Sequence, residues 1–85
     1  MEVVYTRAFF KRLTKYEEDF QEVIFEKIEE FRHRANHKRI KVHKLHGKFS
    51  NCFSFSVNYK TRIVFEYISK NEVALLSIGD HEIYN

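Results

Sequence analysis

The spacing of apolar residues changes from a helical to a strand period partway along this chain, and this change limits the folds open to it. Up to residue 31, apolar side chains recur every three or four positions, as on the buried face of an amphipathic helix. From Ile40 the period becomes two, and over residues 53–59 large apolar residues alternate with serine and asparagine. Helices that precede strands, rather than alternate with them, indicate an α+β fold.

The first part of the chain predicts a short strand followed by two helices. Residues 2–5 are β-branched and aromatic, and Thr6 is a good helix N-cap. The apolar stripe of the first helix comprises Phe9, Phe10, Leu13 and Tyr16, and that of the second Phe20, Val23, Ile24, Ile28 and Phe31. Asp19 is expected to cap the second helix, and Asn36 to end it in a left-handed conformation.

The second part predicts antiparallel strands. Residues 62–68 and 72–78 are evenly apolar, which is typical of strands in the middle of a sheet. Their connections, "NYKT" and "SKN", have hairpin length and are rich in turn formers. We therefore expect one domain over residues 1–85 with the order β-α-α-β-β-β. Two N-terminal helices should pack on one face of a mostly antiparallel sheet, and function should lie on the other, partly polar face.

The composition limits the class of protein. Eighty-five residues with 44% hydrophobic content suffice for one core but not for two domains. Cys52 is the only cysteine, so an intramolecular disulfide is impossible and a reducing, cytoplasmic location is expected. Residues 1–20 contain four bases and no long apolar run, which argues against a signal peptide or a membrane span.

Charge is divided sharply along the chain. Residues 17–30 contain seven acids and only Lys27 as a base, whereas residues 32–48 contain seven bases, four histidines and no acid. Lysine and arginine that neutralise phosphates gain affinity by releasing counterions, so the basic segment favours contact with RNA. Phe49, Phe53 and Tyr59 lie nearby and can supply stacking. The alternative is that these bases only solvate a helix end and an edge strand.

Histidines supply the candidate chemistry. Their spacing allows metal binding, but no cysteine supports it, and we favour a proton-transfer role, which needs neither metal nor cofactor. His33 and His37 are expected to be exposed residues that tune surface charge. The string "IGDHEIYN" is the most unusual feature, because it places Asp80, His81 and Tyr84 directly after an apolar strand. It is either a site at the sheet rim or a polar strand terminus.

Three segments in order, "VHKLHGKF", "CFSFSVNYKTRIVFEY" and "VALLSIGDHEIY", carry a resemblance to a known family. Together they resemble the RelE/ParE superfamily of toxins from toxin–antitoxin systems, over nearly the whole chain. The resemblance to the RelE, YafQ and YoeB branch implies a ribosome-dependent mRNA endonuclease that cuts in the ribosomal A site without metal. It also implies a cognate antitoxin as partner.

The resemblance assigns roles to individual residues. Arg62 matches the arginine that opens the "YRLVY" strand and stabilises phosphate charge. His81 falls where YafQ-like members place a histidine, and Tyr84 matches a tyrosine that stacks on the substrate. His43 aligns with a further histidine and is the second candidate for proton transfer. Contacts with mRNA or ribosomal RNA phosphates are then expected from Lys41, Lys44, His46 and Lys48.

The sequence also departs from the RelE pattern. RelE carries two lysines on the strand where this chain has Ser54 and Ser56. This departure leaves two alternatives, an active site built from His43, Arg62 and His81, or a weakened toxin. A binding module of the same fold also remains open, either a ParE-like inhibitor of DNA gyrase or an inactive homologue. His81 and Tyr84 argue against the ParE branch, which performs no RNA chemistry.

Overall fold

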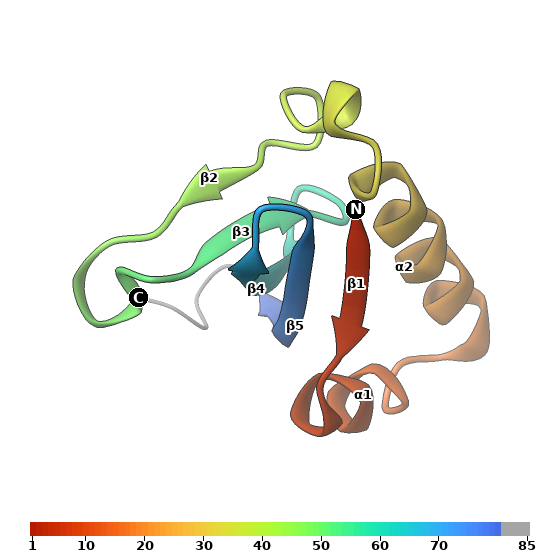
Figure 1. Cartoon of the computed structure of the whole chain (residues 1–85). Helices are drawn as coiled ribbons and strands as arrows, with labels where there is room; N and C mark the ends of the chain where they lie inside the picture. Colours follow the sequence, from red (N-terminus) through yellow and green to blue (C-terminus); the bar gives the residue numbers. More distant parts are fainter. Residues whose placement is uncertain (81–85) are drawn as a thin grey trace.

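The computed structural model describes residues 1–80 as a small α+β domain (Figure 1). In chain order the elements are β1 (Glu2–Tyr5), α1 (Arg7–Leu13), α2 (Glu18–Phe31), the 3-10 turn η1 (Arg34–Asn36), β2 (His43–Lys44), the 3-10 turn η2 (Gly47–Phe49), β3 (Phe53–Ser56), β4 (Thr61–Ser69) and β5 (Glu72–Asp80). The predicted order of strands and helices is confirmed, and β2 adds one very short strand to it.

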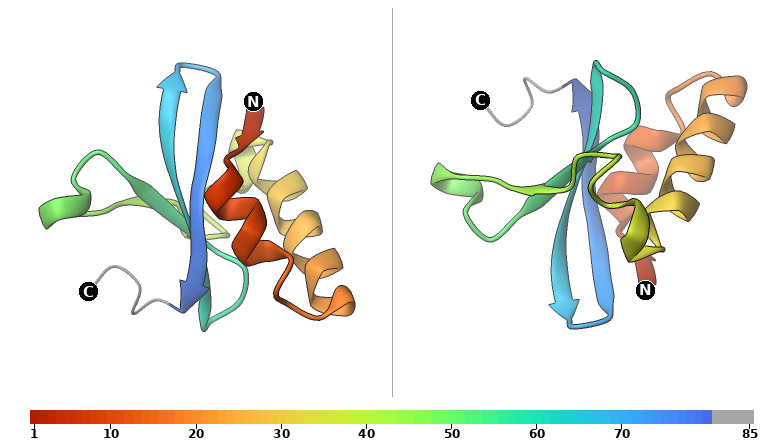
Figure 2. Two further views of the ribbon diagram at one scale, coloured as in Figure 1. Left: turned by 90° about the horizontal axis from the view of Figure 1, so that it is seen from below. Right: turned by 90° about the horizontal axis from the view of Figure 1, so that it is seen from above.

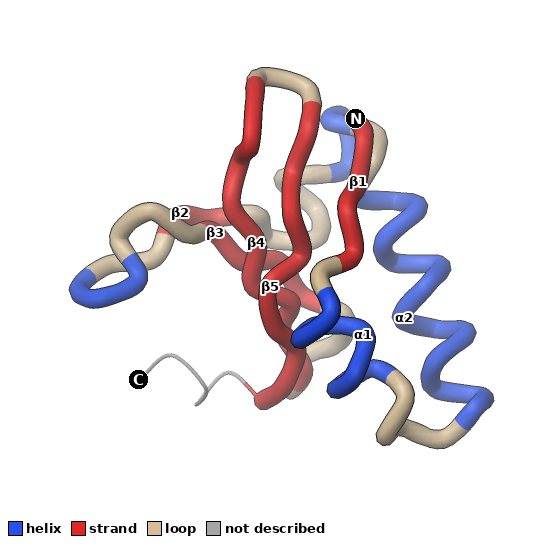
Figure 3. Tube along the Cα trace, turned by 60° about the horizontal axis from the view of Figure 1, so that its bottom comes forward, coloured by secondary structure: helices blue, strands red, loops and turns tan. Residues whose placement is uncertain are grey.

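The five strands form one sheet in the order β1-β5-β4-β3-β2. β1 pairs parallel to β5, and the other three pairs of neighbours, which are consecutive along the chain, are antiparallel. Figure 3 shows the long β4–β5 hairpin at the centre of this sheet. Both central strands have nine residues, whereas the outer β2 has only two, which leaves a short edge for unwanted pairing.

Both helices cover the same face of the sheet, as predicted. Figure 2 shows α1 and α2 on one side of the β4–β5 hairpin, while the β2–η2–β3 connection, residues 43–56, extends away on the other side. The core lies under the helices. Phe31 of α2 stacks on Phe55 of β3 with ring centroids 4.4 Å apart, and it also packs against Phe65 of β4. This contact joins the second helix to the centre of the sheet.

Some predicted helix boundaries are confirmed and others are wrong. The Thr6 side chain accepts a hydrogen bond from the Phe9 amide and caps α1 as expected. Asp19 does not cap α2, because that helix begins at Glu18 and its N-cap residue is Glu17. Asn36 is not a left-handed terminator, since α2 ends earlier, at Phe31, through an ordinary right-handed Arg32.

Two predicted stripe residues face solvent instead of the core. Phe10 keeps 48% and Val23 38% of their surface exposed, because neither helix is fully enclosed. The predicted strand over residues 53–59 also ends early, at Ser56, where the chain turns into β4. Neither helix described in residues 1–80 combines the length and apolar character needed to cross a bilayer.

Candidate active site

Strand pairing brings His43 and Arg62 to the same face of the sheet. His43 lies opposite Ser54, Ser56 lies opposite Arg62, and directly paired residues project from the same face. Phe55, between the two serines, points to the helices. The polar face opposite the helices, predicted as the functional one, therefore carries His43, Ser54, Ser56 and Arg62.

The register also fixes the spacing of the two candidate residues. β3 separates β2 from β4, and Ser54 and Ser56 are two residues apart along it. Strand spacings of about 4.8 Å and rises of about 3.4 Å per residue place the Cα atoms of His43 and Arg62 roughly 12 Å apart. A histidine and an arginine at this separation can approach one phosphate group from two sides.

Backbone contacts set the tautomer of His43. Its Nδ1 atom lies 2.9 Å from the carbonyl oxygen of Lys41. A carbonyl oxygen only accepts hydrogen bonds, so Nδ1 carries the proton and Nε2 of the neutral ring is the acceptor. The fully buried Ser54 places its hydroxyl 3.4 Å from this Nε2. The His43 side chain is exposed on the open face, and its acceptor nitrogen Nε2 lies beside the Ser54 hydroxyl.

Arg62 lies in β4 opposite Gly79 of β5, so no side chain from that neighbour stands beside it. Its Nη1 donates hydrogen bonds to the carbonyl oxygens of Asn58, at 2.8 Å, and Tyr59, at 2.9 Å. Both acceptors belong to the turn between β3 and β4. The guanidinium is therefore anchored at one corner, and its charge is not neutralised by any acid within residues 1–80.

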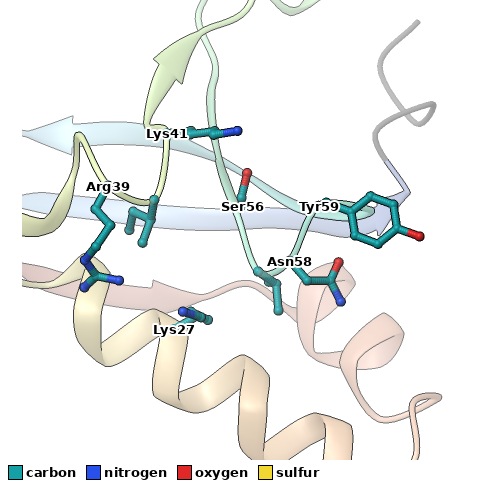
Figure 4. A pocket seen from close by; sticks show the side chains of 8 residues that line it. Lys27, Arg39, Lys41, Ser56, Asn58 and Tyr59 are labelled. Atoms are coloured by element: carbon teal, nitrogen blue, oxygen red, sulfur yellow. The ribbon is translucent and has the colours of Figure 1, made fainter.

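Lys41 lies in the segment next to the end of β3, since the Ser56 amide donates a hydrogen bond to the carbonyl oxygen of Ile40 at 2.9 Å. Figure 4 shows the Ser56 hydroxyl pointing toward the side chain of Lys41. Lys41 is exposed and has a positive φ of 61°, which is uncommon for a residue with a side chain. The Ser56 Oγ atom is buried and has no hydrogen-bond partner in the described part of the chain. Lys41 thus extends beside the end of β3 that carries Ser56.

A hollow of about 200 Å³ opens beside these residues, between α2 and the β3–β4 turn (Figure 4). Lys27, Arg39 and Lys41 line it together with Asn58 and Tyr59. Glu30, which is outside the lining, pairs with both Lys27 and Arg39 and so offsets part of their charge. The hollow is basic, and its third cation, Lys41, pairs with no acid within residues 1–80.

The other predicted RNA contacts lie on the β2–η2–β3 connection. Lys44, His46 and Lys48 are all exposed, and the Lys48 ammonium lies 5.5 Å from the centre of the Phe49 ring. Gly47, with a φ of +71°, supplies the tight turn at this tip. Lys44 thus follows His43 directly in β2, whereas His46 and Lys48 lie farther along the projecting segment beside the open face.

The two remaining histidines of the basic segment differ from each other. His33 is exposed as predicted. The prediction of an exposed His37 is wrong, because its ring stacks on Phe31, and its Nε2 atom lies 2.7 Å from the Phe31 carbonyl oxygen. His81 and Tyr84 lie outside the described residues. Within residues 1–80, no three histidine, cysteine, aspartate or glutamate side chains gather closely enough to hold a metal ion.

The sequence alone does not reveal the roles of two residues of this site. It marks Ser54 only as the place of a missing lysine, yet Ser54 contacts His43, and this contact depends on the β2–β3 register, which no local pattern reveals. It marks Asn58 only as a turn former. Asn side chains often accept hydrogen bonds from backbone amides two or three residues later and so stabilise a turn. The segment "NYKT", in which an Asn stands three residues before a strand, carries this signal.

Comparison with known proteins identifies the fold. No protein-family model and no curated protein matches this sequence. Solved structures do match. The toxin–antitoxin complex RelBE2 from Mycobacterium tuberculosis superposes with a TM-score of 0.77 at 16% identity, covering 94% of this chain and 96% of that chain. The YoeB–YefM complex from Staphylococcus aureus gives 0.72 at 16% identity, covering 95% and 97%.

YafQ from E. coli also matches, with a TM-score of 0.64 at 9% identity, over 95% of this chain and 93% of that chain. These superpositions establish the fold. At identities this low they do not establish the chemistry of the site. The family resemblance of the three sequence segments is thereby confirmed at the level of the fold. The chain has the fold of the RelE- and YoeB-type toxins of toxin–antitoxin systems.

Proposed function

We propose that this chain is the toxin of a toxin–antitoxin pair and cleaves mRNA in the ribosomal A site without a metal ion. The observation that carries the proposal is the geometry of His43, whose Nε2 is held as a hydrogen-bond acceptor on the same face as Arg62. Cleavage by an RNA 2′-hydroxyl needs a base, a cation for the developing charge and an acid. Translating ribosomes place this activity in the cytoplasm.

In this mechanism His43 accepts the proton of the 2′-hydroxyl at Nε2. The 2′-oxygen then bonds to the adjacent phosphorus, and the bond from phosphorus to the 5′-oxygen breaks. His81 donates a proton to that leaving oxygen, which yields a 2′,3′-cyclic phosphate and a 5′-hydroxyl. Arg62 stabilises the charge on the pentacovalent phosphate, and Tyr84 stacks on a substrate base.

Lys41 takes over the charge that Ser54 and Ser56 lack relative to the RelE pattern. Its side chain lies beside Ser56, the residue paired with Arg62 (Figure 4). Lys44, His46 and Lys48 on the projecting segment contact flanking phosphates. The site therefore gathers its cations from neighbouring segments instead of from β3 itself.

Cleavage of mRNA on programmed ribosomes tests the proposal. The native chain should release a fragment with a cyclic or 3′ phosphate in the presence of a chelator. His43→Ala should slow cleavage by about 10²- to 10⁴-fold and Arg62→Ala by about 10²- to 10³-fold. The exposed residues His33 and Arg7, each changed to alanine, are matched controls and should leave the rate unchanged. Intact mRNA with the native chain would refute the endonuclease.

An antitoxin is the proposed protein partner. The exposed apolar residues on β1, α1 and α2 suit the apolar face of a partner helix, and they comprise Val4, Tyr5, Phe10, Val23 and Phe25. RelBE2 and YoeB–YefM are complexes of this kind. Phe25→Glu should keep cleavage activity but escape inhibition by the cognate antitoxin.

One observation favours a second candidate, a toxin-fold binding module without catalysis. β3 carries Ser54 and Ser56 in place of two lysines, and a serine supplies no charge. Growth arrest with intact mRNA and inhibited DNA supercoiling would select a gyrase inhibitor, and growth without arrest would select an inactive homologue.

A further inference from the structure

The anchoring of Arg62 depends on a turn that another residue builds. Arg62 Nη1 donates to the carbonyl oxygens of Asn58 and Tyr59, at 2.8 and 2.9 Å. A long arginine side chain that is free in solvent samples many rotamers. These two bonds restrict it, so the position of the guanidinium follows the orientation of the two carbonyls.

The Asn58 side chain determines how the Tyr59 carbonyl points. Its Oδ1 accepts hydrogen bonds from the amides of Lys60, at 2.9 Å, and Thr61, at 2.7 Å. The Lys60 amide and the Tyr59 carbonyl belong to one planar peptide unit and point in opposite directions. When Asn58 holds the amide, the carbonyl on the other side of this plane is therefore directed at Arg62.

The anchored guanidinium leaves one binding edge free. The two protons of Nη1 are used by the carbonyl oxygens of Asn58 and Tyr59 and, at 3.4 Å, of Thr61, whereas Nε and Nη2 donate to no group within residues 1–80. Nε and Nη2 lie on one edge of the planar group, and such an edge matches two oxygens of a phosphate. The turn thus holds the arginine without occupying the atoms that a phosphate needs.

We infer that Asn58 is a positioning residue for Arg62, which holds the Nε–Nη2 edge of the guanidinium ready for the substrate phosphate. This inference rests on the proposed cleavage of RNA. Asn58 does not touch the reacting atoms itself. It acts through the Tyr59 carbonyl of its turn, and its removal leaves Arg62 charged but less restricted.

The test is a double-mutant cycle on single-turnover cleavage with saturating ribosomes. Asn58→Ala removes the acceptor without backbone strain, because Asn58 has no positive φ. We expect it to slow cleavage by about 10- to 100-fold, as for other small misplacements of catalytic groups. Asn58→Ser, which keeps a weaker side-chain acceptor, should recover part of the rate. The exposed Asn51 changed to alanine is the matched control.

The cycle separates positioning from a general effect on stability. In an Arg62→Ala background, Asn58→Ala should change the rate by less than about 2-fold, because there is no guanidinium left to position. An equal loss in both backgrounds, or a native rate for Asn58→Ala, would overturn the inference. If Asn58→Ala unfolds the chain, the same cycle is read with Asn58→Ser.

A second measurement does not require activity. The Nε–Hε signal of Arg62 in a ¹⁵N NMR spectrum, identified by its loss in Arg62→Ala, should report an ordered side chain. In Asn58→Ala it should become as mobile as the signal of the exposed Arg7. An ordered Arg62 in that variant contradicts the inference even if cleavage is observed. Loss of order with no cleavage by the native chain supports the anchoring and rejects the proposed function alone.

Discussion

At the scale of single residues, the buried hydroxyl of Ser56 is a polar group without a hydrogen bond in the described part of the chain. Its Oγ has no hydrogen-bond partner among the described residues, and an unpaired buried hydroxyl costs about 1–3 kcal/mol. Ser56→Ala should therefore leave the free energy of unfolding unchanged or raise it by up to about 1 kcal/mol, measured by urea denaturation.

Ser54→Ala is the matched comparison, because it removes a fully buried hydroxyl that does contact His43. It should lower the free energy of unfolding by about 0.5–1.5 kcal/mol. A loss of stability in Ser56→Ala as large as that in Ser54→Ala would show that the Ser56 hydroxyl is not unpaired.

The sequence identifies the charged and ionisable residues of the site better than the residues that hold them in position. His43 and Arg62 are predicted, and the structure places them on one face. The roles of Ser54 and Asn58 are not predicted, because a cross-strand contact depends on register and an anchoring turn on carbonyl directions. The left-handed residue is expected at Asn36 but is Lys41, whose conformation follows from the path of the chain between α2 and the edge of β3.

At the scale of elements, the Glu30 carboxylate links the end of α2 to the following segment through an ion pair with Arg39. Glu30 accepts hydrogen bonds from Arg39 and Lys27, and these bonds hold the pKa of its carboxyl below the ordinary value of 4.5. A lowered pKa means that the folded state binds the proton less well than the unfolded chain does. This contribution to stability is therefore present above about pH 4.5 and is lost as the pH falls through the folded-state pKa.

Glu30→Gln tests this contribution by unfolding at several pH values. Near neutral pH the variant should be less stable than the native chain by about 0.2–1 kcal/mol, and the difference should shrink as the pH falls below about 4.5. The exposed Glu26 changed to glutamine is the control and should show no such pH dependence. A difference that stays constant from neutral to acidic pH would contradict the assignment.

Phe31 of α2 packs against the segment that follows the helix and against two strands of the sheet. Its ring lies between those of His37 and Phe55, at 4.9 and 4.4 Å with interplanar angles of 9° in both cases. Phe31→Ala should lower the free energy of unfolding by about 3–5 kcal/mol, because it removes a fully buried ring and leaves a cavity.

Thermal and urea unfolding measure this loss. Phe10→Ala is the matched control, because 48% of the surface of Phe10 is exposed. This variant should lose far less free energy of unfolding than Phe31→Ala. Equal losses for the two phenylalanines would mean that the contacts of Phe31 with His37 and Phe55 contribute little.

Elements with strong local signals are predicted correctly, and those that depend on neighbours are not. β1, the Thr6 cap and both hairpins follow from propensity, capping and turn chemistry. The two-residue strand β2 exists only because the edge of β3 offers it partners, so no pattern within residues 43–44 predicts it. The alternation of apolar and polar residues continues beyond Ser56, but the chain forms a turn there. The Asn58 side chain accepts hydrogen bonds from the amides of Lys60 and Thr61 in this turn.

For the whole molecule, charge separation sets how it meets RNA. The net charge is only +3, yet the acids gather on α2 and its approach, whereas the exposed bases Lys44 and Lys48 lie on the segment that extends from the opposite side of the β4–β5 hairpin (Figure 2). A polyanion is repelled by one region and attracted by the other, so the field favours approach toward the open face of the sheet.

The salt dependence of binding tests this arrangement. A 2′-O-methyl oligonucleotide, which cannot be cleaved, is titrated with protein at several salt concentrations by fluorescence anisotropy. Changing Lys44 and Lys48 to glutamine should reduce the slope of log Kd against log salt by about 0.7 for each phosphate that the protein no longer neutralises. Lys11 and Lys70, exposed elsewhere, are the matched pair and should leave the slope unchanged. Equal changes for both pairs would point to net charge alone.

The fold of the whole molecule can be predicted because several weak signals agree. The switch in period indicates the α+β class, and the three sequence segments carry the family resemblance, which the solved structures support at the level of the fold. The chemistry of the site can be predicted less completely, since it depends on side-chain directions and on residues 81–85, which lie outside the described part.

The parallel pairing of β1 with β5 has a consequence for the moment at which the site forms. Glu2 lies opposite Glu72, so a ribosome synthesises the first strand about seventy residues before its partner. The cap residue Thr6 likewise donates its hydroxyl proton to the Leu75 carbonyl, at 2.6 Å. β5 has to leave the ribosome before β1 and α1 can dock and before Arg62 faces Gly79. Under the proposed activity, the chain is therefore harmless to the ribosome that makes it until β5 has left that ribosome.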